Sequence, residues 1–151
     1  MNPTDRRKLR YQTFDDVKTD IQRLRTSRYA KVGNWSLEQT CDHLTKAFQA
    51  QLSAPPAAAT DEQKAARPLF EKVLATGDIP GGLQAPEFLT PPPDASPAAV
   101  DEFLAMLDRV KQHERPITMH RRFGPMTAEE FRKLGLAHCG HHLSHLIPAT
   151  P

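Results

Sequence analysis

Apolar residues recur every three or four positions in four long stretches of the chain, a pattern that predicts amphipathic α-helices. The first predicted helix runs from about Thr13 to Arg28. The second begins after Ser36, which forms a capping box with Gln39, and it stops at the proline pair that starts with Pro55. Each of these helices has one apolar face to bury against a neighbour.

Two further helices are expected in the second half of the chain. Pro97 suits the first position of the third helix, whose apolar stripe ends at the sequence HERP. Thr127 and Glu130 form another capping box, which opens a fourth helix that stops near Pro148. Four apolar stripes of this kind can share one core.

The connection between the second and third helices, Ser53 to Pro97, carries nine of the fourteen prolines. It is expected to be mostly irregular, with one short helix that follows Pro68 and ends at Gly77. Extended character is confined to PITMHRRF, residues 116–123, and no neighbouring run is evident that would pair with it in a hairpin. The expected fold is therefore all-α: a single domain over residues 1–151, built as a four-helix bundle with a long proline-rich crossover.

Composition narrows the class of protein. An apolar fraction of 38% and a charged fraction of 25% are typical of a soluble globular domain, and no apolar run approaches the roughly 20 residues of a membrane span. The net charge of +2 is too small for a nucleic-acid-binding surface, and the basic run Arg6 to Arg10 is interpreted as a solvated N-terminal arm. No secretory signal is visible, and Cys41 and Cys139 are expected to be free thiols, so a cytoplasmic location is expected.

Four of the seven histidines fall within eight residues of the fourth helix, in GLAHCGHHLSHL. Residues four apart on a helix lie about 5–6 Å from each other at Cβ, so His138 with His142, and His141 with His145, are both spaced to share a metal ion. Projection at about 100° per residue turns rings of both pairs toward the apolar face of Phe131 and does not choose between the pairs. Because an unpaired polar ring is costly to bury, something inside the protein has to satisfy these rings.

A third ligand on another helix would complete such a site, since metal sites in helical bundles draw on facing helices. His43, in the second helix, is the best candidate and lies at the edge of its apolar stripe, beside Ala47. The alternative is a histidine-rich surface or dimer face without metal. His113 and His120 are interpreted as solvated or loop-structural residues, and Cys139 as a small buried hydrophobe rather than a thiolate ligand.

Two segments carry a resemblance to a known family: GNWSLEQTCDHLTKAF and, much later, HRRFGPMTAEEFRKLGLAHCGHHLSHL. With the order of the helices between them, they resemble the DinB/YfiT-like superfamily of metalloenzymes, and within it a branch known only as a domain of unknown function. The resemblance implies an up-down-down-up bundle that forms a homodimer. It also implies one divalent metal held by His43, His138 and His142, with three residues close by in the pocket wall: His141, His145 and Trp35.

Three neutral imidazoles leave at least one coordination position open, as in catalytic rather than closed structural sites. Zinc, nickel and iron(II) all suit such ligands, and the sequence does not choose among them. Characterised members of the superfamily include thiol-dependent transferases and isomerases, so the resemblance favours an enzyme that uses a low-molecular-weight thiol on a small-molecule substrate over a metal-dependent hydrolase. A non-catalytic metal-binding or dimerising bundle is the second hypothesis. DNA binding is a third, and the balanced charge argues against it.

Overall fold

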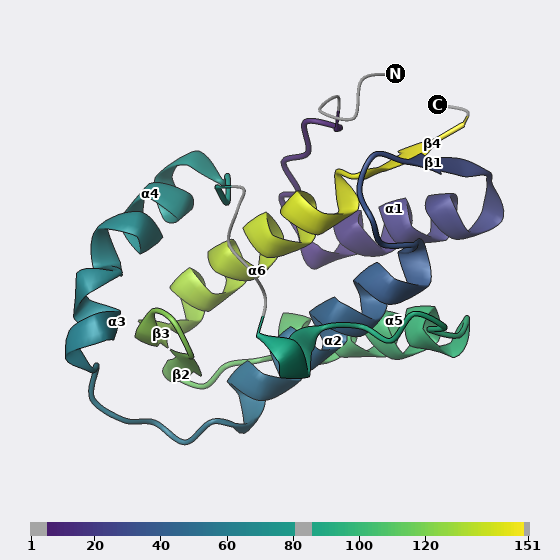
Figure 1. The fold of residues 1–151 in the computed structure, drawn as a ribbon. Coiled ribbons are helices and arrows are strands. Elements are labelled where there is room, and N and C mark those ends of the chain that lie inside the picture. Colours follow the sequence, from purple (N-terminus) through teal and green to yellow (C-terminus); the bar gives the residue numbers. More distant parts are fainter. Residues whose placement is uncertain (1–5, 81–85, 150–151) are drawn as a thin grey trace.

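The computed structural model describes residues 6–80 and 86–149. Within these ranges lie six α-helices, one short 3₁₀ helix and four short strands (Figure 1). The helices are α1 (Phe14–Thr26), α2 (Leu37–Ser53), α3 (Asp61–Ala65), α4 (Arg67–Thr76), α5 (Ala98–Lys111) and α6 (Ala128–Leu143). The 3₁₀ helix is η1 (Glu87–Leu89), and the strands are β1 (Tyr29–Lys31), β2 (Ile117–His120), β3 (Gly124–Thr127) and β4 (Leu146–Pro148). None of the helices in these ranges has the length and apolar character that a membrane crossing needs.

The four long helices predicted from periodicity are present as α1, α2, α5 and α6. At the start of α2, Ser36 Oγ accepts a hydrogen bond from the Gln39 N–H, and the Gln39 side chain accepts one from the Ser36 N–H. Thr127 and Glu130 form the same reciprocal pair at the start of α6. Each cap satisfies two backbone donors that a helix end leaves open and contributes about 1 kcal/mol, so these starts follow from local sequence.

The expected all-α four-helix bundle is wrong, because two small antiparallel sheets are part of the fold. The extended run does have a partner: β2 pairs with β3, with Ile117 opposite Thr127 and His120 opposite Gly124. Gly124 has a φ of 77°, which a residue with a Cβ atom rarely adopts, and this permits the tight return of the chain. The partner strand, GPMT, contains both glycine and proline and shows no alternation, so the sequence pattern hid the hairpin.

The second sheet joins β1 to β4, with Tyr29 opposite Pro148 and Lys31 opposite Leu146. The predicted fourth helix therefore ends at Leu143 rather than near Pro148, because the chain leaves the helix to pair with β1. This places the last of the four clustered histidines, His145, outside the helix.

The crossover between α2 and α5 is more ordered than expected. Its predicted short helix is α4, which ends at Gly77, but α3 and η1 are present as well. α4 packs on α6, and the crossover wraps one side of the molecule (Figure 1).

The core lies among α1, α2, α5 and α6. Phe48 of α2 is at its centre, with its ring against those of Phe14, Phe103 and Phe131. Burying each of these rings contributes about 2–3 kcal/mol. A Cβ atom at Gly135 would lie 2.9 Å from the Phe48 ring, so this glycine lets α6 approach α2 closely. The close approach brings the histidines of the two helices together.

The basic segment Arg6 to Arg10 is only in part the solvated arm that its charge suggested: Arg6, Lys8 and Arg10 are exposed, but Arg7 is not. The Arg7 guanidinium donates two hydrogen bonds of 2.9 Å to the Asp20 carboxylate and one of 3.0 Å to the Leu143 carbonyl. The Tyr11 hydroxyl donates to the same carboxylate. The segment is therefore held between α1 and the end of α6, because Asp20 is a buried charge that needs a partner.

Candidate metal centre

Three histidines converge where α2 faces α6. His43 comes from α2, and His138 and His142 lie one turn apart on α6. His138 Nε2 lies 3.3 Å from His43 Nε2 and 3.0 Å from His142 Nε2, and the ligand atoms of all three rings are within 4.8 Å of one another. Among the described residues, this is the group of histidine, cysteine and carboxylate side chains that is close enough to hold a metal ion.

Burial keeps the three rings neutral. It lowers the pKa of each imidazole below its ordinary value of 6.5, and the neighbouring histidines lower the pKa of His138 and His142 further. His43 Nδ1 lies 2.8 Å from the Leu89 carbonyl oxygen, so Nδ1 carries the proton and donates it to that carbonyl. His43 Nε2 is consequently an unprotonated nitrogen that faces the ring of His138.

These nitrogens fit a divalent transition metal. Zinc–imidazole bonds of about 2.0–2.1 Å at tetrahedral angles separate the ligand nitrogens by about 3.3 Å. The separations of 3.3 and 3.0 Å made by His138 Nε2 are close to that value. Three neutral rings that face one another have too few protons to pair every nitrogen, and unpaired buried nitrogens are costly. A cation held among them removes that cost.

Trp35 covers the cluster from one side. Its ring stacks on His142, with 5.4 Å between ring centroids and 22° between the ring planes, and it leans on His43 at 4.9 Å. With the Leu89 carbonyl, Trp35 restricts the orientation of two of the three rings, as partners of metal-binding histidines commonly do.

His141 and His145 lie beside the cluster but are not part of it. The His141 ring packs edge-on against His142 at 4.9 Å, and the His145 ring lies 5.6 Å from that of His141. Burial, with the nearby charge of Arg6, lowers the pKa of His141 to about 4. An Arg6 guanidinium nitrogen lies 3.1 Å from His141 Nδ1, which therefore accepts the hydrogen bond. Of the two pairs spaced by four, only His138 with His142 approaches His43.

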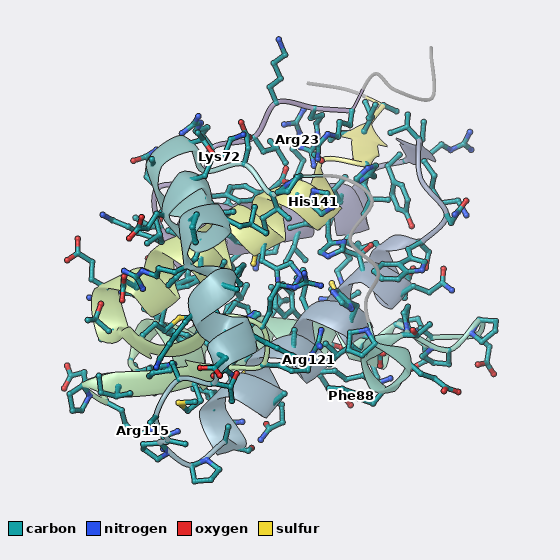
Figure 2. The ribbon with its side chains drawn as sticks, turned by 60° about the vertical axis from the view of Figure 1, so that its left-hand side comes forward. Arg23, Lys72, Phe88, Arg115, Arg121 and His141 are labelled. Carbon is teal, nitrogen blue, oxygen red and sulfur yellow. The ribbon has the colours of Figure 1, made fainter. Side chains whose placement is uncertain are left out.

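The cluster forms part of the wall of a large cavity. The cavity has a volume of about 900 Å³, within the range of small-molecule sites. His43, His138 and His142 line one region of it, while residues of α3, α4 and the β2–β3 turn line other regions. Figure 2 shows His141 above, and Arg121 and Phe88 below, the middle of the view, and all three belong to the lining. A metal ion held by the three histidines would thus face a space that can hold a small molecule.

The remaining histidines and the cysteines have structural surroundings. His113 Nε2 lies 2.7 Å from the Thr118 hydroxyl, and its ring packs on Phe131. His120 Nδ1 accepts hydrogen bonds from two backbone N–H groups of the β2–β3 turn, and the residue also lines the cavity. Cys41 and Cys139 are free and fully buried, and burial raises the pKa of both thiols. Both cysteines are therefore inert, as expected for small buried hydrophobes.

A comparison with protein families assigns the chain to one of them. The model of a family described as a protein of unknown function, DUF1569, matches residues 3–149. The chain belongs to the DUF1569 family. No curated protein and no solved structure matches it significantly. The site of this DUF1569 protein therefore has to be interpreted from its own geometry.

Sequence reasoning missed the part of the DUF1569 site that lies outside the helices. The Leu89 carbonyl orients His43 from η1, and Arg121 and Arg122 reach the cavity from the β2–β3 turn. A backbone carbonyl leaves no signal in residue identity. The turn would have been recognised only by pairing GPMT with the preceding extended run.

Proposed function

We propose that the protein is a metal-dependent enzyme that acts on a small molecule, with His43, His138 and His142 as the ligands of one divalent metal ion. The observation that carries the proposal is the position of three neutral imidazoles on the wall of a cavity of about 900 Å³. A structural metal site is closed by its protein ligands, whereas a catalytic site keeps a position open toward substrate. Imidazole ligands suit zinc, nickel or iron(II), and metal availability decides among them.

A bound ion would supply a Lewis acid that lowers the pKa of a thiol and favours its thiolate form. The chain's own residues hold and shield the site. The Leu89 carbonyl fixes the proton of His43 on Nδ1, Trp35 covers one side of the cluster, and Leu134 and Val73 contribute apolar surface to the cavity wall.

Thiol transfer is favoured over hydrolysis by the residues of the cavity. No aspartate or glutamate lines it among the described residues, so a carboxylate general base, the usual partner of a hydrolytic metal, is missing from that lining. Asp42, next to His43 in sequence, forms an ion pair with Lys46 instead. In the proposed reaction a low-molecular-weight thiolate attacks an electrophilic carbon and a C–S bond forms. The leaving group departs with its bonding electrons, and the thiol proton goes to solvent.

We further propose that the DUF1569 family is a branch of the DinB/YfiT-like superfamily. The support is the combination of one histidine on an early helix with a pair spaced by four on the last helix, and the convergence of these three residues. The small sheets of this chain add to that arrangement. The same relationship suggests a homodimer that binds neither nucleic acid nor membranes, and light scattering of the purified protein measures its mass in solution.

Elemental analysis and turnover test the proposed function. The untagged protein is expected to bind about one divalent ion per chain, and the loaded protein to consume thiol in the presence of alkyl halide or epoxide electrophiles. Loss of thiol is followed with a thiol reagent, and the conjugate by mass spectrometry. Absence of metal from the protein overturns the proposal. Full metal occupancy without turnover of any thiol and electrophile pair indicates the alternative, a non-catalytic metal-binding or dimerising protein.

A further inference from the structure

Two arginines of the β2–β3 turn line the cavity, and neither has an ion-pair partner among the described residues. Arg121 is exposed and Arg122 half-buried, and both belong to the cavity lining, with Arg121 labelled near the centre of Figure 2. Neither guanidinium makes a hydrogen bond or ion pair with another residue in the part of the chain that the structure describes. By contrast, Arg7, Arg25 and Arg67 are each paired with a carboxylate. The charges of Arg121 and Arg122 are therefore available to a ligand.

Within the residues that the structure describes, no carboxylate of the cavity lining neutralises these charges. Its described lining includes two arginines and six histidines, and no aspartate or glutamate. A concave site with charges of one sign concentrates ligands of the opposite sign. The electrostatics of the lining thus favour an anion.

The backbone that carries the arginines is held in place. His120 Nδ1 accepts hydrogen bonds from the Arg122 N–H at 3.0 Å and the Phe123 N–H at 3.3 Å. The Gln63 side chain donates to the Arg121 carbonyl at 3.1 Å. The backbone of the turn is therefore fixed before a ligand binds. This lowers the entropy that is lost when the two arginines bind a ligand.

The cavity lining also includes a glutamine of α2, about two turns beyond His43. Gln51 of α2 is only 8% exposed and lines the cavity, yet its side chain makes no hydrogen bond to another described residue. The Gln51 amide is not among the fully enclosed polar atoms that lack a partner, so it is accessible from the cavity and can pair with a ligand. Gln51 lies about 12 Å further along α2 than His43, at about 1.5 Å per residue. Between them on the same face, Ala47 and Ala50 line the cavity and leave room above the helix.

We infer that the cavity binds an elongated organic anion, whose carboxylate or phosphate group is held by Arg121 and Arg122. Gln51 hydrogen-bonds to the body of the anion, and its opposite, reactive end extends toward the three histidines, the first of which, His43, lies about 12 Å from Gln51 along α2. Guanidinium groups bind both oxyanions through paired hydrogen bonds. The inference rests on the proposed function for the role of the reactive end, whereas binding of the anionic end depends on the arginines alone.

A binding experiment on the full chain tests the inference. Trp35 is the only tryptophan of the chain, and it lines the cavity, so its fluorescence reports occupancy. The probes are 6-phenylhexanoate, 6-phenylhexyl phosphate and the neutral 6-phenylhexanamide. At least one anion is expected to bind 10-fold or more tightly than the amide, and the stronger of the two identifies the preferred oxyanion.

Variants assign that preference to residues. The double variant R121Q/R122Q should abolish the difference in affinity between the anionic probes and the amide. R121Q alone should reduce that difference. The matched control R132Q removes an exposed arginine outside the cavity and should leave the difference unchanged. Equal binding of the three probes, no binding of either anion, or an unchanged preference in R121Q/R122Q overturns the inference. The metal content of each sample is measured separately, so wild-type protein without metal would refute the proposed function while the anion preference still decides this inference.

Discussion

Two polar clusters meet near the last turn of α6, and they differ in how their groups are paired. In the first, the Asp20 carboxylate accepts hydrogen bonds from Arg7 and Tyr11, and Arg7 also holds the Leu143 carbonyl. The Arg7 charge is matched by the Asp20 charge, and Arg7 Nε alone of that guanidinium is buried without a hydrogen-bond partner. In the second, three neutral imidazoles turn their nitrogens toward one another beside a cavity. The first cluster therefore stabilises the fold, while the second is close enough to hold a metal ion.

The largest effect is expected from removing a ring of the second cluster. His138 Nε2 lies between the other two nitrogens, so His138→Ala should weaken metal binding by at least about 1,000-fold, because loss of a ligand costs more than the 10–100-fold typical of its supporting residues. Competition with a chelating indicator measures the affinity.

His113→Ala is the matched control for that measurement, since His113 contacts Thr118 and Phe131 and lies outside the cluster. It should keep wild-type metal affinity. Undiminished metal binding by the His138→Ala protein would mean that the ligand assignment is wrong.

Breaking the first cluster should instead reduce stability. Asp20→Asn leaves the Arg7 guanidinium, only 17% exposed, without a counter-charge, and the free energy of unfolding is expected to fall by about 3 kcal/mol. Urea denaturation measures it. Asp101→Asn breaks the exposed pair with Arg25 and should cost less than about 1 kcal/mol. Similar losses in the two variants would show that burial of the Asp20 pair is not what matters.

Neutral buried histidines also predict sensitivity to acid. Burial, with the charges of Arg121 and Arg122, lowers the pKa of His120 to about 4, whereas the unfolded chain titrates near 6.5. Between these values the unfolded state binds the proton and the folded state does not, so stability present above pH 6.5 is lost as the pH falls toward 4.

The contribution of His120 between pH 7 and pH 5 should be about 1–2 kcal/mol. Asparagine can keep an acceptor for the turn amides without titrating in this range, so His120→Asn should lose less stability over this interval than the wild type. Thermal unfolding of metal-free protein at both pH values gives the two slopes, and identical slopes would contradict the assignment.

A smaller effect than that of Asp20→Asn is expected from a single hydrogen bond of the first cluster. Tyr11→Phe removes the hydroxyl that donates to Asp20 but leaves the Arg7 pair, so the loss should be about 1–2 kcal/mol. Urea denaturation alongside Asp20→Asn ranks the two contributions. A loss as large as that of Asp20→Asn would assign the stability of the cluster to Tyr11 rather than to the ion pair.

Local patterns in the sequence were enough for the long helices and for part of the site. Apolar spacing and two capping boxes located α1, α2, α5 and α6, because these signals act within a few residues. The spacing of His138 and His142 on one helix was likewise evident from the sequence. Periodicity alone did not separate this pair from His141 and His145, and the resemblance to a family was needed to choose.

Contacts between distant segments decided the rest. Tyr29 of β1 pairs with Pro148 of β4 across most of the chain, and three-residue strands carry too few positions to show a pattern. Arg7 became a buried ion-pair partner only because folding brings Asp20 and the end of α6 to it. The cavity has the same origin, since its walls come from helices, a turn and a crossover that meet only in the folded chain. Helix formation is governed by neighbours in sequence, whereas pairing of strands, burial of charge and the shape of a site depend on neighbours in space.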